Sequence, residues 1–299
     1  MLVDLHNHTV DASDGHLDRL TLVRLAKMRG VDAIAITDHD FILPAATAAE
    51  LTRRTGILVV PGMERTVRAA DGTVIAHFLC YGVCNRDGSA ERQFKQELFA
   101  GIDQYRGERQ RRRPDISLPD LAIETVHYRH HLLNQLAGRH GTTELAGGLP
   151  TAPQELIDAV HAMGGLVVWA HPFTLPRVFR DRVTGILGLD RGPPGPDLDL
   201  ETALRHLQDH DPGWWRVLTT LDGIECRSCS IGFDTIDGKL CERLARLLGK
   251  PMLATSAAHG PKDVASAAIR LGTRVSDEAG LLAGLRSGAV EPVTLYRRA

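Results

Sequence analysis

The sequence is poor in cysteine and in aromatic residues, and it has no long apolar run. Its 299 residues include five cysteines and 5% Phe, Trp and Tyr. An odd number of widely spaced cysteines does not suit a disulfide framework, so we expect reduced thiols. No segment reaches the ~18 apolar residues of a membrane span. The first residues also lack the basic region and apolar stretch of a signal peptide, and we therefore expect a cytoplasmic protein.

An excess of charge of either sign is also missing. Lys and Arg number 35 against 37 Asp and Glu, which gives a formal net charge of -2. No general basic field would recruit nucleic acid, so an anionic substrate must be held by local groups. Cys226 and Cys229 form one CxxC pair, but no second pair accompanies it to complete a zinc site, and we interpret both as structural or incidental thiols.

What the sequence does contain is an alternation of short apolar runs with amphipathic stretches. This alternation is typical of a parallel sheet built from repeated β–α units. At 43% hydrophobic residues, the chain is long enough for one α/β barrel or two smaller domains. Asp71-Gly72 predicts a tight turn before a strand. The expected strands are 2–5, 33–37, 57–60, 74–81, 166–170, 223–226 and 252–255, and the expected barrel helices are 17–28, 44–54, 152–163 and 234–248.

The alternation is interrupted between residues 88 and 150. A charged helix is expected over 91–113, followed by Pro114 and Pro119, a second polar helix, and the breaker-rich Gly147-Gly148-Leu149-Pro150. We interpret 88–150 as a helical insertion that divides the barrel into a first part, 1–87, and a second part, 151–299.

Imidazoles and carboxylates recur at the C-terminal ends of the expected strands. His6 and His8 lie two residues apart, so both point to the same face of a strand. In βα barrels the loops at this end converge, so residues distant in sequence become neighbours. Histidine and carboxylate together suit zinc, manganese or iron. A single buried histidine is commonly a core or capping residue, but the repeated context favours a site; the further candidates are Asp38, His39, Glu64, His77, His171, Glu225 and His259.

These residues carry a resemblance to a known family. The stretches concerned are Asp4-Leu5-His6-Asn7-His8-Thr9, Ile36-Thr37-Asp38-His39-Asp40, Pro61-Gly62-Met63-Glu64, His77, Gly164-Gly165 to Ala170-His171-Pro172, and Thr255 to His259. In this order they resemble the motifs of the PHP (polymerase and histidinol phosphatase) family of metal-dependent phosphoesterases. The similarity spans nearly the whole chain outside the insertion. The insertion is similar to that of the branch acting on nucleoside bisphosphates and RNA 5′ ends.

The resemblance implies a distorted (β/α)7 barrel of PHP type, with an inserted small helical domain, that holds two or three divalent metal ions (Mn, Zn or Fe). It assigns His6, His8 and Glu64 to the first metal; Glu64, His77 and His171 to the second; and Asp14, His39 and His259 to the third.

The chain departs from the family pattern at two positions. Ala257 stands where the family usually has an aspartate ligand of the first metal. Asp14 lies one residue farther from His8 than usual, so Asp11 or His16 are alternatives for the third metal.

Such a site has a clear chemical use. A glutamate shared by two cations lowers the pKa of a bridging water and neutralises charge on a phosphoryl group, and the hydroxide needs no Ser or Cys nucleophile. We assign Glu64, His39 and Asp38 to catalysis. Asp38 and Asp40 flank His39 and are candidates to orient an imidazole through its second nitrogen; Asp40 is equally explained as a helix cap.

A cationic grip on the substrate phosphate is expected from Arg109, Arg112 and Arg227. The first two lie on one face of a helix at i, i+3 spacing, and a guanidinium can bind a phosphate bidentately. The alternative is a solvated helix face, which is the usual explanation of a charge run. His127 and His131 are spaced i, i+4, but we favour a polar surface helix over a metal site there.

We therefore predict metal-dependent hydrolysis of a phosphomonoester in a small phosphorylated metabolite, with a nucleotide favoured and no membrane partner. Three alternatives remain: a 5′-3′ exoribonuclease acting on short RNA, a histidinol-phosphatase-like enzyme, and a non-catalytic barrel that binds a phosphorylated ligand and is degenerate at Ala257.

Overall fold

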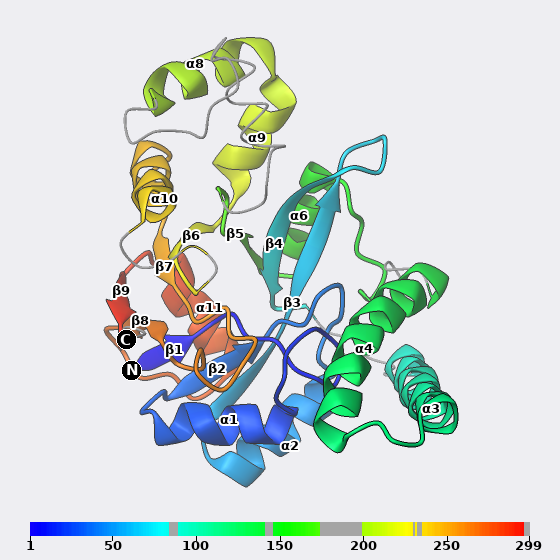
Figure 1. Ribbon diagram of the computed structural model, residues 1–299. Helices are drawn as coiled ribbons and strands as arrows, with labels where there is room; N and C mark the ends of the chain where they lie inside the picture. The colour runs from blue at the N-terminus through cyan, green and yellow to red at the C-terminus, as the bar shows by residue number, and fades with distance from the viewer. Residues whose placement is uncertain (84–88, 141–145, 174–198, 230, 232–234, 296–299) are drawn as a thin grey trace.

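The computed structural model of the chain describes residues 1–83, 89–140, 146–173, 199–229, 231 and 235–295. The strands are β1 (Leu2–Asp4), β2 (Ala33–Ile36), β3 (Leu58–Arg68), β4 (Val74–Tyr81), β5 (Leu166–Ala170), β6 (Gly223–Arg227), β7 (Met252–Ala254), β8 (Ala267–Leu271) and β9 (Val290–Thr294). The helices are α1 (Arg19–Met28), α2 (Ala45–Thr55), α3 (Ser89–Arg112), α4 (Leu118–His140), α6 (Pro153–Ala162), α8 (Leu200–His210), α9 (Pro212–Thr220), α10 (Ile236–Leu247) and α11 (Glu278–Arg286). Figure 1 labels these elements.

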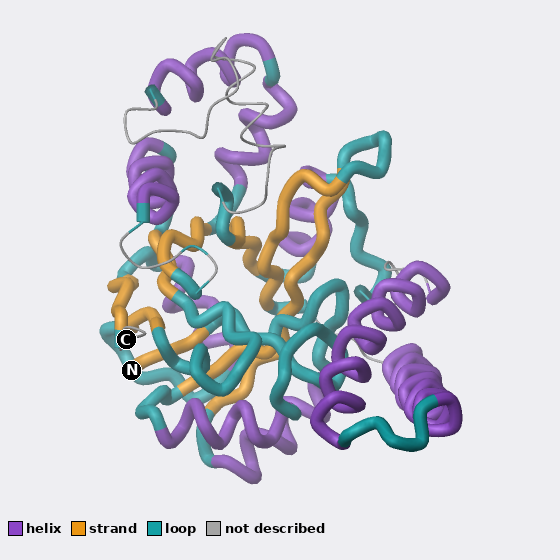
Figure 2. The backbone as a smooth tube through the Cα atoms, viewed as in Figure 1, coloured by secondary structure: helices purple, strands orange, loops and turns teal. Residues whose placement is uncertain are grey.

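The described strands form one mixed sheet with the order β7-β6-β5-β4-β3-β2-β1-β8-β9. Strands β1 to β3 are parallel, as are β5 to β7. β4 runs antiparallel to both β3 and β5, and β8 runs antiparallel to both β1 and β9. The edge strands β7 and β9 lie against each other, so the sheet curls into a nearly closed barrel with helices outside it (Figure 2). The predicted distorted α/β barrel is confirmed, and the reversed strands are the source of its distortion.

The barrel interior is filled by alternate side chains of its strands. Val3 and Leu5 from the β1 region meet Val168 and Ala170 of β5 in one buried cluster, which also contains residues of β2, β3, β4, β7 and β8. This alternation is what a closed sheet requires. The apolar face of α11, including Leu281, belongs to the same cluster and covers one end of the barrel. The opposite end, where β1 and β2 finish, is available for a functional site.

Local sequence explains most element boundaries. α1 is capped at its N-terminus by Asp18, whose carboxylate accepts a hydrogen bond from Thr21 N at 3.0 Å. α2 is capped at its C-terminus by Gly56, which has φ 75°, a conformation that glycine adopts at little cost. β3 continues to Arg68, well past the predicted residue 60, because it pairs with β4 in a long hairpin. The predicted turn at Asp71-Gly72 lies at the tip of this hairpin, with Gly72 at φ 84°.

Helices α3 and α4 occupy the predicted insertion, and α4 lies between α3 and the barrel (Figure 1). Their apolar residues, among them Phe94, Leu98 and Leu136, form a cluster with Ala12 and Phe41 from the loops that follow β1 and β2. The segment thus rests on the barrel end that carries the candidate ligands. Its standing as a separate domain, with boundaries at 88 and 150, stays a prediction.

None of the described helices combines the length and the apolarity needed to cross a membrane. Cys80, Cys226, Cys229 and Cys241 are free thiols, and burial raises the pKa of the Cys226 thiol well above its usual range.

Candidate metal centre

Glu64 on β3 is the centre of a cluster of imidazoles, and its carboxylate is 1% exposed. Its Oε2 atom lies 3.0 Å from His6 Nε2, 3.1 Å from His8 Nε2 and 3.4 Å from His39 Nδ1. Backbone contacts fix this arrangement: Glu64 N donates to Asp38 O at 3.3 Å, beside His39. The loops after β1 and β2 are thereby held against β3.

The other oxygen of Glu64 faces a second pair of imidazoles. Oε1 lies 3.0 Å from His77 Nδ1 and 2.9 Å from His171 Nε2. His77 is on β4 and His171 follows β5, so the antiparallel hairpin delivers one ligand and the next strand the other. His171 has φ 31°, an unusual conformation for a residue with a side chain, and it precedes Pro172. Strain of this kind is retained where surrounding contacts impose it.

The atoms around Glu64 Oε2 have the spacing of a metal site. His6 Nε2 and His8 Nε2 are 3.0 Å apart, and each lies 3.0–3.1 Å from Glu64 Oε2. Ligand atoms around zinc at about 2.0–2.1 Å in a tetrahedron are roughly 3.3 Å apart. Three donor atoms in a nearly equilateral triangle therefore fit one divalent cation with a position left open.

A third group of candidate metal ligands lies closer to solvent. Asp14 Oδ2 is 3.4 Å from His259 Nε2, and Asp14 Oδ1 is 3.9 Å from His39 Nε2 and 3.8 Å from His8 Nδ1. The side chains of Asp14, His39 and His259 are 29–36% exposed, whereas those of His6 and His8 are 1% exposed. The third group therefore forms the open side of the centre. Within the part of the chain that is described, clusters able to hold a metal are His8-Asp14-His39-His259, His6-His8-Glu64 and His39-Glu64-His77.

The loop that carries Asp14 is shaped by its neighbours Ser13 and Gly15. Ser13 Oγ accepts from His39 N at 3.2 Å and lies 3.3 Å from His8 Nδ1. A Cβ at Gly15 would lie 2.3 Å from His8 O, so only glycine allows this close approach of the two backbone segments. Asp11, the alternative ligand, instead accepts a hydrogen bond from Arg19 N at 3.0 Å.

The charges in the cluster are strongly coupled. For His6, burial lowers the pKa but the carboxylates of Glu64 and Glu225 raise it, to about 10. For Glu64, burial raises the pKa, yet His39 and His6 hold it well below the usual range of a carboxyl. Burial lowers the pKa of His8 to about 3. The centre thus combines an ionised Glu64 with a proton on His6, and a divalent cation bound there would replace that proton.

Asp38 and Asp40 are bonded to other partners than the predicted His39 ring. Asp38 accepts from Thr9 N at 2.6 Å and from Thr9 Oγ1 at 2.7 Å, which anchors the loop after His8. Asp40 accepts from Arg65 Nη1 at 2.8 Å and from Thr66 N at 2.9 Å. These contacts support a structural task for both carboxylates, and the catalytic role of Asp38 stays a prediction.

Two of the three arginines predicted to grip phosphate are paired with glutamates, and the role of all three in substrate binding stays a prediction. Arg109 Nε donates to Glu124 on α4 at 2.5 Å, and Arg227 donates to Glu242 on α10 at 2.7–2.9 Å. Arg112 is exposed near the end of α3. Arg129 on α4 contacts the loop that carries Asp14: its guanidinium donates to the carbonyl oxygens of Val10 and, at 2.7 Å, Ser13. The sequence signal for Arg129 was weak, because it lies on a helix rich in polar residues.

Glu225, a candidate ligand by its place on a strand, contacts the far side of the His6 ring. It is completely buried, and its Oε1 lies 2.9 Å from His6 Nδ1, on the side of the ring away from Glu64. Ala257, at φ 44°, leaves the first group without the carboxylate that the family pattern predicts there. Its carbonyl oxygen lies 3.0 Å from His259 Nδ1 and helps to orient that ring.

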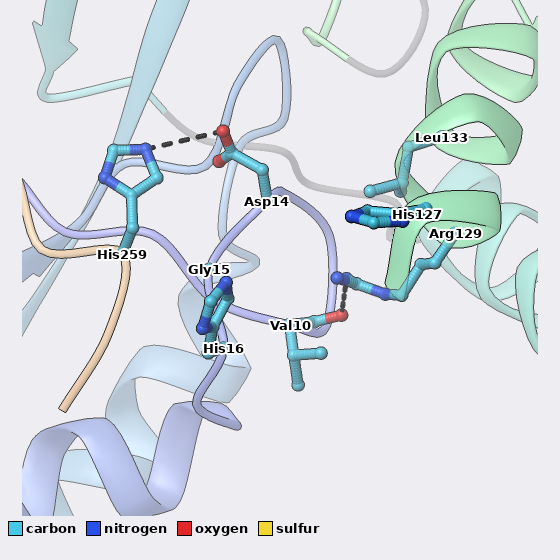
Figure 3. A pocket seen from close by; sticks show the side chains of 8 residues that line it. All are labelled: Val10, Asp14, Gly15, His16, His127, Arg129, Leu133 and His259. Atoms are coloured by element: carbon cyan, nitrogen blue, oxygen red, sulfur yellow. Dashed lines mark hydrogen bonds and ion pairs between the residues drawn. The ribbon is translucent and has the colours of Figure 1, made fainter. Parts of the chain in front are cut away.

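A cavity of about 590 Å³ opens beside the third group. Figure 3 shows Asp14 and His259 on one side and residues of α4 on the other, with Arg129 bonded to Val10. The lining residues are Val10, Asp14, Gly15, His16, His127, Arg129, Leu133 and His259. The wall thus combines apolar carbons, imidazoles and one guanidinium, and the inserted helix supplies the half of it that faces the candidate metal ligands.

Comparisons with known proteins agree with this description. A family profile described as PHP-associated matches residues 239–290. The 5′-3′ exoribonuclease Rnm of Salmonella typhimurium is 42% identical over 66 residues, and a phosphoribosyl 1,2-cyclic phosphate 1,2-diphosphodiesterase of Eggerthella lenta is 35% identical over 83 residues. These matches cover 21% and 28% of this chain, and only 22% and 31% of the relatives.

The fold itself is shared over the full length of the chain. A solved structure of an amidohydrolase from Chromobacterium violaceum, with bound sulfate and no metal, superposes with a TM-score of 0.50 at 20% identity, over 98% of both chains. The resemblance predicted from the motifs is confirmed.

Proposed function

From the premise that this chain is similar to the PHP family in sequence and in fold, we propose that it is a metal-dependent phosphomonoesterase acting on a small phosphorylated metabolite, with a nucleotide as the favoured substrate. The observation that carries the proposal is the division of Glu64: one oxygen faces His6 and His8, and the other faces His77 and His171. A carboxylate shared in this way would hold two cations side by side.

The buried and the exposed residues of the centre would then have different tasks. When bound, the divalent ions would acidify a water molecule and take up charge on the phosphoryl oxygens. Glu64 and the buried imidazoles fix the positions at which this happens and exclude bulk water. Asp14, His39 and His259 form the exposed rim through which the phosphoryl group would enter. Because Glu64 and its nearest imidazoles are buried and only the rim is exposed, we expect a substrate of which the phosphate alone reaches the buried groups.

The cavity supports the choice of substrate. Pockets for small molecules commonly measure about 300–1,000 Å³, and the present one lies within that range. The apolar side chains of Val10 and Leu133 and the imidazole of His127 suit a flat organic group, and Arg129 supplies positive potential. A nucleoside meets these requirements, which is why we favour it over a purely polar leaving group.

The proposal is tested by metal reconstitution. The purified protein is stripped with a chelator, reloaded separately with Mn²⁺, Zn²⁺ or Fe²⁺, and assayed with an aryl phosphate and a panel of mononucleotides. We expect phosphate release that depends on the added metal. A manganese-loaded protein that releases no phosphate from any member of the panel contradicts the proposal, and favours the alternative of a binding protein without turnover.

The match to an exoribonuclease favours a second candidate, in which the same centre removes nucleotides from the 5′ end of short RNA. A 5′-phosphorylated, 3′-labelled hexaribonucleotide distinguishes the two. Successive shortening of the labelled strand supports the exonuclease, whereas loss of the terminal phosphate with the strand intact supports the monoesterase.

Replacing His127 with alanine tests the assignment of the cavity to substrate. We expect KM to rise about tenfold, as befits one lost contact of about 1.4 kcal/mol, with kcat changed less than about twofold. The matched control is His131→Ala, one helical turn further on, where the imidazole contacts Gln135 at 2.9 Å. Equal kinetic constants for the two variants would exclude the α4 wall from substrate binding.

Introducing at position 257 the carboxylate that the family pattern predicts tests the ligand group of the first metal. Ala257→Asp is expected to tighten binding of the first metal by about tenfold or more, the equivalent of one charge-assisted contact of about 1.5–3 kcal/mol. Aspartate tolerates the positive φ of this position better than most residues. Calorimetric titration of the metal-free protein measures the change, and an unaltered affinity would mean that position 257 does not reach the metal.

A further inference from the structure

We propose that Glu225 is a positioning residue that aligns one metal ligand on each side of Glu64: the ring of His6 for the first group and the backbone of His171 for the second. The inference rests on the proposed function, since it assigns a task within the same centre. It differs from the expectation that Glu225 is itself a ligand.

The contacts of the Glu225 carboxylate are all made to groups around the centre. It lies on β6 with no exposed surface. Oε1 is 2.9 Å from His6 Nδ1 and also accepts the hydroxyl of Thr255, while Oε2 accepts a hydrogen bond from His171 N at 2.9 Å. A buried carboxylate with donors on both oxygens is satisfied where it stands and has no need of a cation.

The bond to His6 fixes which nitrogen is available for a metal. When a metal replaces one proton of His6, the imidazole that binds it is neutral; because a carboxylate only accepts hydrogen bonds, the proton that stays must be on Nδ1. Nε2 then carries the lone pair, and this atom is the one that lies 3.0 Å from both Glu64 Oε2 and His8 Nε2. Carboxylates that orient ligating histidines in this manner are a general feature of metal sites.

The bond to His171 acts on the main chain. This residue holds φ 31° before a proline, a conformation that the isolated chain rarely adopts. The Glu225 Oε2 atom holds the amide of His171, and the ring beyond it places Nε2 2.9 Å from Glu64 Oε1. The Glu225 carboxylate thus stabilises the uncommon backbone conformation of His171 and the Nδ1-protonated tautomer of His6.

Glu225→Gln separates this role from simple packing, because glutamine has the same shape but one oxygen and one NH₂ group. If the oxygen accepts from His171 N, the NH₂ group faces His6 Nδ1 and demands a lone pair there, which moves the imidazole proton to Nε2. If the oxygen faces His6, two donors meet at His171. In either orientation, glutamine loses one of the two contacts that Glu225 makes, the one with His6 or the one with His171.

The experiment measures metal binding and histidine tautomer in the full-length protein. Calorimetric titration of the metal-free protein with Mn²⁺ should show an affinity about 10–100-fold weaker in Glu225→Gln than in the wild type. Long-range ¹H–¹⁵N spectra of the Zn²⁺-loaded proteins should show the His6 proton on Nδ1 in the wild type and displaced from it in the variant. Absorption of the Co²⁺-loaded proteins gives a third readout of ligand geometry.

Two further variants complete the design. Glu242→Gln is the control, because this glutamate pairs with Arg227 and Arg246 outside the centre; we expect unchanged metal binding. Glu225→Asp keeps the charge but shortens the reach, so we expect an intermediate loss, and it replaces the glutamine variant should that protein not fold.

The outcomes separate this inference from the proposed function. A wild-type protein that binds no divalent metal overturns the proposed function. A wild type that binds Mn²⁺ and turns over substrate, with Glu225→Gln or Glu225→Asp equal to it in affinity, tautomer and Co²⁺ spectrum, overturns the role of Glu225 alone.

Discussion

Glu64→Gln is expected to abolish turnover, with kcat/KM reduced by at least about 10³-fold, because metal ions contribute several kcal/mol to such reactions and each 1.36 kcal/mol is a factor of ten. Glutamine has one oxygen, whereas Glu64 offers one to His6 and His8 and another to His77 and His171. The amide NH₂ would point at one of these pairs as a donor. At least one cation should therefore be lost, which elemental analysis of the dialysed protein measures alongside the kinetics.

The control for this experiment is Glu50→Gln. Glu50 pairs with Arg53 on the exposed surface of α2, and its side chain is 47% exposed. This change removes the same charge from the protein and should leave both metal content and rate unchanged. A Glu64→Gln protein that keeps its full metal content and a tenth of its activity would contradict the central role of Glu64.

The residues around Glu64 could be predicted because they follow a simple rule. Parallel strands end at the same rim, so a histidine that follows β1, β2 or β5 can be expected near the others without knowledge of the packing. His77 obeys a different rule. It lies within β4, which runs antiparallel to its neighbours, and its arrival at Oε1 depends on the β3–β4 register that pairs Thr66 with His77.

The partners of the ligands could not be predicted in the same way. Glu225 also follows from the strand-end rule, but whether a carboxylate faces the metal or the back of an imidazole depends on distances of a few ångströms. The interpretation of Asp38 met the same limit, since Thr9 competes with His39 for its oxygens. Arg109 and Arg129 lie on different helices of one helical pair, and only packing decides that Arg129 faces the barrel.

The fold, too, could be predicted only in part. The regular β–α alternation predicted β1 to β7 with boundaries close to those observed, except that β3 continues to Arg68 instead of ending at residue 60. It did not predict β8, β9 or α11, which close the barrel after the last repeated unit. Closure depends on contacts between distant segments, such as the pairing of β8 with β1, and such contacts leave no periodic pattern in the sequence.

Arg65→Met is expected to lower the free energy of unfolding by about 3–5 kcal/mol, the usual effect of breaking a buried ion pair from one side. Arg65 is completely buried on β3; its Nη1 donates to Asp40 at 2.8 Å, and its other nitrogens donate to Leu149 O and Pro150 O. The guanidinium therefore ties the chain that returns from the helical insertion to the residue beside His39. Methionine fills a similar volume, but the Asp40 carboxylate loses its cationic partner and the two carbonyl groups lose the Arg65 donor.

Denaturant titration of Arg65→Met, with Arg53→Met beside it, measures this effect. Arg53 makes the equivalent pair with Glu50, but its side chain is 73% exposed, so its loss should cost no more than about 1 kcal/mol. The double variant Arg65→Met/Asp40→Asn should recover part of the stability, because no unpaired charge then stays buried. If Arg65 ties the helical insertion to the metal centre, its loss should disturb His39 and the third group of metal ligands together with the fold. A loss of unfolding free energy below about 1 kcal/mol in Arg65→Met would contradict this connection.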